Sequence, residues 1–135
     1  MVEHSIDVMV FSKDRPLQLD GLLRSLSANM KGVNTCVLYH YEEEYISAIE
    51  ELKRTHPNVE FIKQTDFCAQ VKTFVNNSAE HCMFLVDDIV FKEDVDVTMI
   101  KNVMDNNINI MTFSLRLGLH LDTCYPLSSK QPIPQ

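Results

Sequence analysis

The chain has 135 residues, of which 45% are hydrophobic and 23% are charged, and its formal net charge is −7. This length suits one domain with a sizeable core, and a negative charge without any local Lys/Arg cluster argues against a nucleic-acid partner. No apolar run is long enough to span a bilayer, and Glu3, His4 and Asp7 interrupt any segment that resembles a signal peptide. We therefore expect a cytoplasmic protein without a transmembrane segment.

Strand-like and helix-like segments alternate along the chain. A short apolar strand at 6–12 comes first, and Pro16 then suits the first position of a helix whose leucines recur at helical spacing up to Asn29. The later elements continue the alternation: strands at 33–41, 59–63, 82–86 and 109–117, and helices from Glu42 to Pro57, after Asp66, and at 96–106. Asp66 suits the N-cap position of its helix.

These elements predict a three-layer α/β fold: an open, mostly parallel sheet with helices on both faces. The fourth strand, CMFLV at 82–86, is apolar at every position, which predicts a central strand covered on both sides. We assign 1–118 to this domain. We expect 119–135, which contains three prolines, to be an extended C-terminal arm.

Four cysteines, Cys36, Cys68, Cys82 and Cys124, form no CxxC pair and no close group with histidines. This spacing argues against a zinc site. We expect buried free thiols, because a reduced cysteine inside an apolar segment behaves as a small hydrophobic residue.

Polar residues follow several predicted strands, and ligands of open α/β sheets bind beyond the carboxyl ends of the strands. The most informative are Asp87 and Asp88, which end the apolar fourth strand. Adjacent carboxylates repel each other and lose hydration at such a position, and a divalent cation with oxygen ligands would relieve both costs. The alternative is that both aspartates point to solvent and cap a turn before Phe91.

The start of the first helix is a second candidate site. Lys13 and Arg15 flank a helix N-terminus, where a small anion is favoured, whereas an exposed basic pair in a loop is the simpler explanation. The absence of GxGxxG after the first strand and of GxxxxGK[ST] anywhere argues against a redox dinucleotide or a P-loop nucleotide. A receiver domain would have paired acids after its first strand, where this chain has only Asp14.

Three segments resemble nucleotide-sugar glycosyltransferases of the GT-A fold: IDVMVFSKDRPLQLDGLLRSL at 6–26, CMFLVDDIVF at 82–91 and MTFSLRLG at 111–118. In that family the loop after the first strand lies against the base and ribose, and an acidic DxD motif holds a divalent metal on the donor's diphosphate. The resemblance covers the nucleotide-binding half of such an enzyme and implies a truncated fold of the nucleotide-diphospho-sugar transferase type.

The resemblance also implies roles for individual residues. Position 89 is Ile, so the third acid of DxD is missing; Asp88 is then the expected ligand of Mn²⁺ or Mg²⁺, and Asp87 assists it or binds ribose. The other expected nucleotide-binding residues are Ser12, Lys13, Asp14, Arg15, Asp66 and Lys72.

The function implied is binding of a nucleoside diphosphate sugar through a divalent metal, in the service of glycosyl transfer to an acceptor that the sequence does not identify. Family members continue into an acceptor-binding half that supplies the base of inverting enzymes, so catalytic residues stay unassigned in this expectation. The alternative is a non-catalytic, degenerate glycosyltransferase-like module that acts in assembly or interaction. A sheet edge left half-empty near the C-terminus would favour a homo-oligomer.

Overall fold

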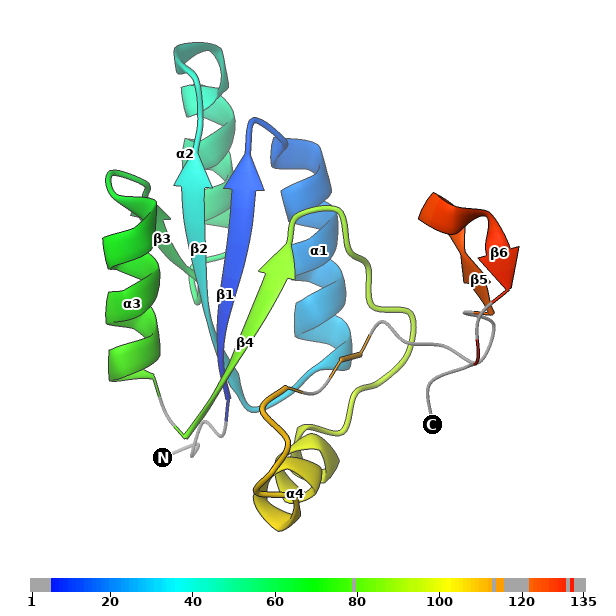
Figure 1. The fold of residues 1–135 in the computed structure, drawn as a ribbon. Coiled ribbons are helices and arrows are strands. Elements are labelled where there is room, and N and C mark those ends of the chain that lie inside the picture. Colours follow the sequence, from blue (N-terminus) through cyan, green and yellow to red (C-terminus); the bar gives the residue numbers. More distant parts are fainter. Residues whose placement is uncertain (1–5, 79, 113, 116–121, 131, 133–135) are drawn as a thin grey trace. The chain divides into compact units, whose positions relative to one another are not determined.

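The computed structural model describes residues 6–78, 80–112, 114–115, 122–130 and 132. They form two compact units, which divide between Asn102 and Val103. Strands and helices alternate through the first unit, with these bounds: β1 Ile6–Lys13, α1 Pro16–Asn29, β2 Val33–His40, η1 Glu43–Tyr45, α2 Ile46–Thr55, β3 Glu60–Lys63, α3 Phe67–Asn77 and β4 His81–Val86 (Figure 1). The next helix, α4 Val97–Asn106, begins in the first unit and contains the division.

The four strands of this unit form one open sheet in the order β3-β2-β1-β4, and every neighbouring pair is parallel. The chain passes outward from β1 to β2 and β3, and then returns across the sheet to β4 on the other side of β1. Strand order therefore reverses between β1 and β4, which makes their carboxyl ends a topological switch point. The predicted α/β fold with an open parallel sheet is confirmed at this level.

Helices cover both faces of the sheet: α1 and α2 lie on one face and α3 lies on the other (Figure 1). The handedness of the crossovers explains this placement. Because parallel crossovers are right-handed, the two outward connections place α1 and α2 on the same face, and the returning connection places α3 on the opposite face.

The larger core lies between the sheet and the helices α1 and α2. The four leucines that the sequence places at helical spacing on α1 are all at most 3% exposed. They pack with Val8 and Val10 of β1, Ile49 of α2 and Ile100 of α4. Each buried leucine contributes roughly 1.5–3 kcal/mol, so this face supplies most of the hydrophobic stabilisation.

A smaller core lies between the sheet and α3. Met9, Cys36 and Leu38 are buried there, and Val71 and Phe74 of α3 pack against them. Alternating residues of β1 and β2 thus supply both cores, as expected for strands covered on two sides.

The predicted helix starts are confirmed for α1 and α3. Pro16 is the first residue of α1. The carboxylate of Asp66 accepts a hydrogen bond of 2.9 Å from the Ala69 N–H and so caps α3. At the second helix, the glutamates form a 3₁₀ turn, Glu43–Tyr45, before α2 begins at Ile46.

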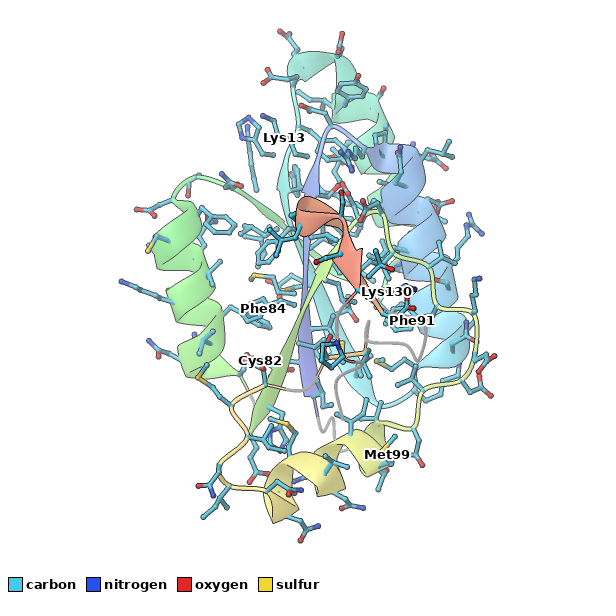
Figure 2. The ribbon with its side chains drawn as sticks, turned by 45° about the vertical axis from the view of Figure 1, so that its right-hand side comes forward. Lys13, Cys82, Phe84, Phe91, Met99 and Lys130 are labelled. Carbon is cyan, nitrogen blue, oxygen red and sulfur yellow. The ribbon has the colours of Figure 1, made fainter. Side chains whose placement is uncertain are left out.

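The predicted central position of the fourth strand is wrong for the described residues, because β4 lies at an edge of their sheet. Phe84 and Val86 are 44% and 41% exposed, although the ring of Phe84 projects toward α3 and lies 5.9 Å from that of Phe74 (Figure 2). An apolar run indicates burial but not how many strands flank it, and side chains at an edge have neighbours on one flank only.

The strand predicted at 109–117 does not form in the described residues 109–112 and 114–115; Arg116 and Leu117 lie outside the described residues. Met111 is 90% exposed, and Ile110 and Leu115 are 39% and 41% exposed, so the described apolar residues of this segment gain little packing. The second unit instead contains a small antiparallel pair, β5 Thr123–Cys124 and β6 Ser129–Lys130, joined by a 3₁₀ turn. The predicted domain boundary at 118 lies outside the described residues.

Among the described residues, no helix has the length and apolar character needed to cross a membrane. Cys36 is buried, as predicted, whereas Cys82 is only half-buried; the exposure of Cys124 lies outside what the structure describes. Cys68 is exposed on α3, so the prediction of burial is wrong for this residue.

Candidate functional site

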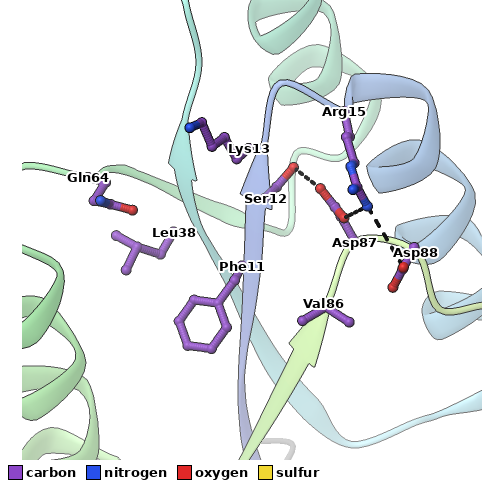
Figure 3. A pocket seen from close by; sticks show the side chains of 9 residues that line it. All are labelled: Phe11, Ser12, Lys13, Arg15, Leu38, Gln64, Val86, Asp87 and Asp88. Atoms are coloured by element: carbon purple, nitrogen blue, oxygen red, sulfur yellow. Dashed lines mark hydrogen bonds and ion pairs between the residues drawn. The ribbon is translucent and has the colours of Figure 1, made fainter. Parts of the chain in front are cut away.

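The candidate site lies where the carboxyl ends of β1 and β4 meet (Figure 3). The last residue pair of these strands is Phe11 with Val86, so Ser12 and Asp87 come directly after it. Their side chains point to the same side of the sheet edge, and the Ser12 hydroxyl donates a hydrogen bond of 2.9 Å to the Asp87 carboxylate. The sequence predicted both residues for the site, and the fold brings them together.

The two aspartates occupy different environments. The side chain of Asp87 is 7% exposed and that of Asp88 is 57% exposed. Arg15, the N-cap residue of α1, reaches both carboxylates: its guanidinium lies 3.5 Å from Asp87 and 3.8 Å from Asp88. One cation therefore stands between two anions at the switch point (Figure 3).

A cavity of about 410 Å³ opens at this edge of the sheet. Its volume falls in the range of roughly 300–1,000 Å³ that is usual for small-molecule sites. Charged and polar groups line one part of it, and apolar side chains line the rest. The lining residues are Phe11, Ser12, Lys13, Arg15, Leu38, Gln64, Val86, Asp87 and Asp88.

Three residues expected at the site are not among those that line this cavity. The Asp14 carboxylate accepts a hydrogen bond of 2.8 Å from the Glu42 N–H and so joins two loops. Asp66 is occupied as the cap of α3, and Lys72 is exposed on the same helix.

Several lining residues were not among the predicted site residues. Gln64 follows β3, so its place after a strand was the available signal. Phe11, Leu38 and Val86 gave no such signal, because apolar residues at strand ends look like ordinary core residues.

Tyr41 also belongs to the candidate site, although it is not among the predicted site residues. It follows β2, is 7% exposed, and its hydroxyl lies 3.0 Å from the Ser12 Oγ. Burial raises the pKa of the Tyr41 phenol, and the nearby Asp87 charge adds to this. The phenol therefore stays protonated at neutral pH.

The loop that follows Asp88 is held along α1. The Ser25 hydroxyl oxygen accepts a hydrogen bond of 3.1 Å from the Phe91 N–H, and the Asn29 amide donates one of 3.2 Å to the Phe91 carbonyl. The Asn29 carbonyl accepts a third bond, of 2.8 Å, from the Val95 N–H. Helix α1 thus carries Arg15 at its start and anchors, further along, the segment that follows the two aspartates.

The fold and the site define a class: an open parallel α/β domain with a charged cavity at its switch point, the usual place for ligands in such sheets. Over 98% of its length, the chain is similar to the bifunctional glycosyltransferase pgtA of Dictyostelium discoideum, with 26% identity over 144 residues. The match spans 19% of that protein. This similarity relates the chain to glycosyltransferases at a distance. No protein-family model and no solved structure matches the chain.

Proposed function

We propose that the chain binds a nucleoside diphosphate sugar, together with Mn²⁺ or Mg²⁺, in the cavity at the carboxyl ends of β1 and β4, and that this binding serves glycosyl transfer. The observation that carries the proposal is the meeting of Arg15, Asp87 and Asp88 at the switch point. The distant similarity of this chain to a glycosyltransferase supports the same proposal.

The two kinds of lining suit the two ends of such a ligand. The planar guanidinium of Arg15 is suited to phosphate oxygens, and Lys13 adds a second, exposed cation. Apolar side chains of Phe11, Leu38 and Val86 offer a surface for a nucleobase. The Lys13–Arg15 segment also directly precedes α1, whose first turn and dipole favour negative charge.

The carboxylates fit a divalent metal ion. Mg²⁺ and Mn²⁺ take hard oxygen ligands, and Mg²⁺ typically combines one or two carboxylates with phosphate oxygens and water. Asp88 suits this role, because its carboxylate is largely exposed beside the cavity and its ion pair with Arg15 is the longer of the two. When bound, the ion would neutralise charge on the departing diphosphate.

Asp87 has a different role in this proposal. It accepts a hydrogen bond from Ser12 and pairs with Arg15, so its carboxylate already has partners on both oxygens. We assign to Asp87 the task of holding Arg15 at the edge of the cavity, where the Arg15 side chain remains 53% exposed and can meet a phosphate.

A thermal titration tests the proposal. The melting temperature of the chain is measured with UDP, GDP and their sugars, with and without Mn²⁺, in the wild type and in Asp88→Asn. A ligand that binds only the folded state stabilises it by about 2.7 kcal/mol at one hundred times its Kd. We expect a saturable, Mn²⁺-dependent rise in the wild type that is absent in Asp88→Asn.

Asp94→Asn is the matched control, since Asp94 is an exposed carboxylate of the same loop that is not among the cavity-lining residues. It makes the same change in charge and should keep the full rise. A wild type that responds to no nucleotide, or an Asp88→Asn variant that responds as the wild type does, would contradict the proposal.

A further inference from the structure

Three buried side chains form a hydrogen-bonded chain that leads into the candidate site. Tyr41 follows β2, Ser12 lies in β1 and Asp87 follows β4, and their exposed fractions are 7%, 6% and 5%. The hydroxyl oxygens of Tyr41 and Ser12 are 3.0 Å apart, and Ser12 Oγ is 2.9 Å from Asp87 Oδ2. These two hydrogen bonds thus link three neighbouring strands at the carboxyl edge of the sheet.

The number of available protons determines which group donates each of these two hydrogen bonds. An ionised carboxylate only accepts hydrogen bonds, and a serine hydroxyl has one proton to donate. Since Ser12 donates that proton to Asp87, the Tyr41 hydroxyl must be the donor to Ser12. Each donor polarises the next one, so the pair of bonds is stronger than two isolated bonds would be.

We propose that Tyr41 is a positioning residue of the donor site, which acts through Ser12 to hold the Asp87 carboxylate and, through that carboxylate, Arg15. The inference rests on the proposed function and adds to it a residue that is not among those that line the cavity. Asp87 Oδ2 is fixed by Ser12, and Asp87 Oδ1 then lies 3.5 Å from the guanidinium. Without the Tyr41 hydroxyl, the Ser12 hydroxyl loses the donor that orients and polarises it, and its bond to Asp87 weakens.

The surroundings of Tyr41 allow the hydroxyl to be tested separately from the ring. Its ring makes edge contacts with Tyr39 and Tyr45, at centroid distances of 5.7 and 6.3 Å. Tyr41→Phe keeps both contacts and removes only the hydroxyl. Tyr45→Phe is the matched control, because it removes a hydroxyl from the same aromatic group outside the hydrogen-bonded chain.

Calorimetry in saturating Mn²⁺ measures the Kd of UDP and of GDP for the wild type. The nucleotide that binds more tightly is then measured with Tyr41→Phe, Ser12→Ala, the double variant and Tyr45→Phe. We expect Tyr41→Phe to weaken binding about tenfold, equivalent to about 1.4 kcal/mol, and Tyr45→Phe to leave it unchanged. Because Tyr41 acts through Ser12, the double variant should bind no more weakly than Ser12→Ala. A merely structural role of Tyr41 would give additive losses instead.

Urea unfolding of each variant shows that the comparison is made on folded protein. Wild-type protein that binds neither UDP nor GDP would overturn the proposed function itself. Wild-type binding with an unchanged Kd in Tyr41→Phe, or additive losses in the double variant, would overturn the positioning role of Tyr41 alone.

Discussion

Asp87 and Asp88 are neighbours in the sequence, yet their side chains differ in burial and in hydrogen-bond partners. Alternation along β4 turns Asp87 to the side of Leu85, where burial and the Ser12 hydroxyl hold it, and leaves Asp88 exposed. A buried carboxylate needs such partners, whereas an exposed one is free to take a ligand. The pair that the sequence presents as one motif is therefore one structural carboxylate and one available carboxylate.

Asp14 shows how a single residue sets the shape of the adjoining loop. Its φ is +52°, in the left-handed region that Asn, Asp and Gly tolerate best, and its carboxylate accepts the Glu42 N–H. We expect Asp14→Ala to lower the free energy of unfolding by about 2 kcal/mol, since strain and a lost hydrogen bond each cost about 1 kcal/mol. Urea unfolding measures this loss.

Two further variants of Asp14 separate the contributions. Asp14→Asn keeps an oxygen acceptor and a tolerated backbone, so it should stay close to the wild type in stability. Asp14→Gly removes the strain and the hydrogen bond together and should lie between the two. An alanine variant as stable as the asparagine variant would show that neither contribution matters.

At the scale of elements, α1 is joined to the end of α2 by one carboxylate. Asp20 of α1 lies 2.8 Å from Arg24 of the same helix and 2.8 Å from the imidazole of His56, which follows α2. Burial raises the pKa of Asp20, but the hydrogen bonds with Arg24 and His56 outweigh it, so the pKa falls below the usual 3.8. The ionised carboxylate thus stabilises the folded state.

The sign of the resulting pH dependence follows from this shift. A carboxyl whose pKa is lower in the folded state stabilises the protein above its unfolded pKa and loses that contribution as the pH falls through the folded value. We expect Asp20→Asn to cost about 1 kcal/mol near pH 6 and progressively less below about pH 3.8, measured by urea unfolding. Glu51→Gln, at an exposed ion pair with Arg54, is the control and should change little at either pH. A loss in Asp20→Asn that stays constant down to the lowest pH would contradict this explanation.

Local signals in the sequence were enough to predict several elements. Pro16, the leucines of α1 and the Asp66 cap act over one or two turns of a helix, so their spacing alone predicts them. The edge position of β4 was not predictable in this way, because it depends on which strands pair. The contact between Tyr41 and Ser12 also depends on strand pairing, so local signals did not predict it. The two residues lie 29 positions apart and meet only when β1 and β2 are in register.

At the scale of the first unit, the sheet separates two cores of unequal size. Cys36 lies in the smaller one, beneath α3, and burial raises the pKa of its thiol to about 12, with the carboxylates of Glu60 and Asp7 adding to the effect. A thiol reacts through its thiolate, so this residue should be inert in the folded protein. Its reaction then reports on unfolding of the unit.

Alkylation near pH 8 tests this expectation, followed by mass spectrometry of the peptides. Cys68, which is exposed on α3, should be modified in the native protein, and Cys36 should be modified only after denaturant is added. In concentrated urea the two should react at similar rates. Modification of Cys36 in native protein at the rate of Cys68 would show that the smaller core opens without global unfolding.

The site as a whole was predictable in its charged part and not in its apolar part. Ser12, Lys13, Arg15, Asp87 and Asp88 lie at the ends of strands or just after them, and the rule for open sheets brings such residues together. The side chains of Phe11, Leu38 and Val86 complete the cavity because three strands end near one another. That arrangement belongs to the sheet and not to any segment of the sequence.

The anchoring of the loop after Asp88 has a consequence for how this protein can change. The loop forms its hydrogen bonds with Ser25 and Asn29 through main-chain groups of Phe91 and Val95. Between them, residues 92–94 are exposed and keep their anchor whatever side chains they carry. Substitutions accumulated in evolution or introduced by design can therefore alter the surface of this loop, while the side chains of Ser25 and Asn29 and the packing of Phe91 and Val95 hold its course along α1.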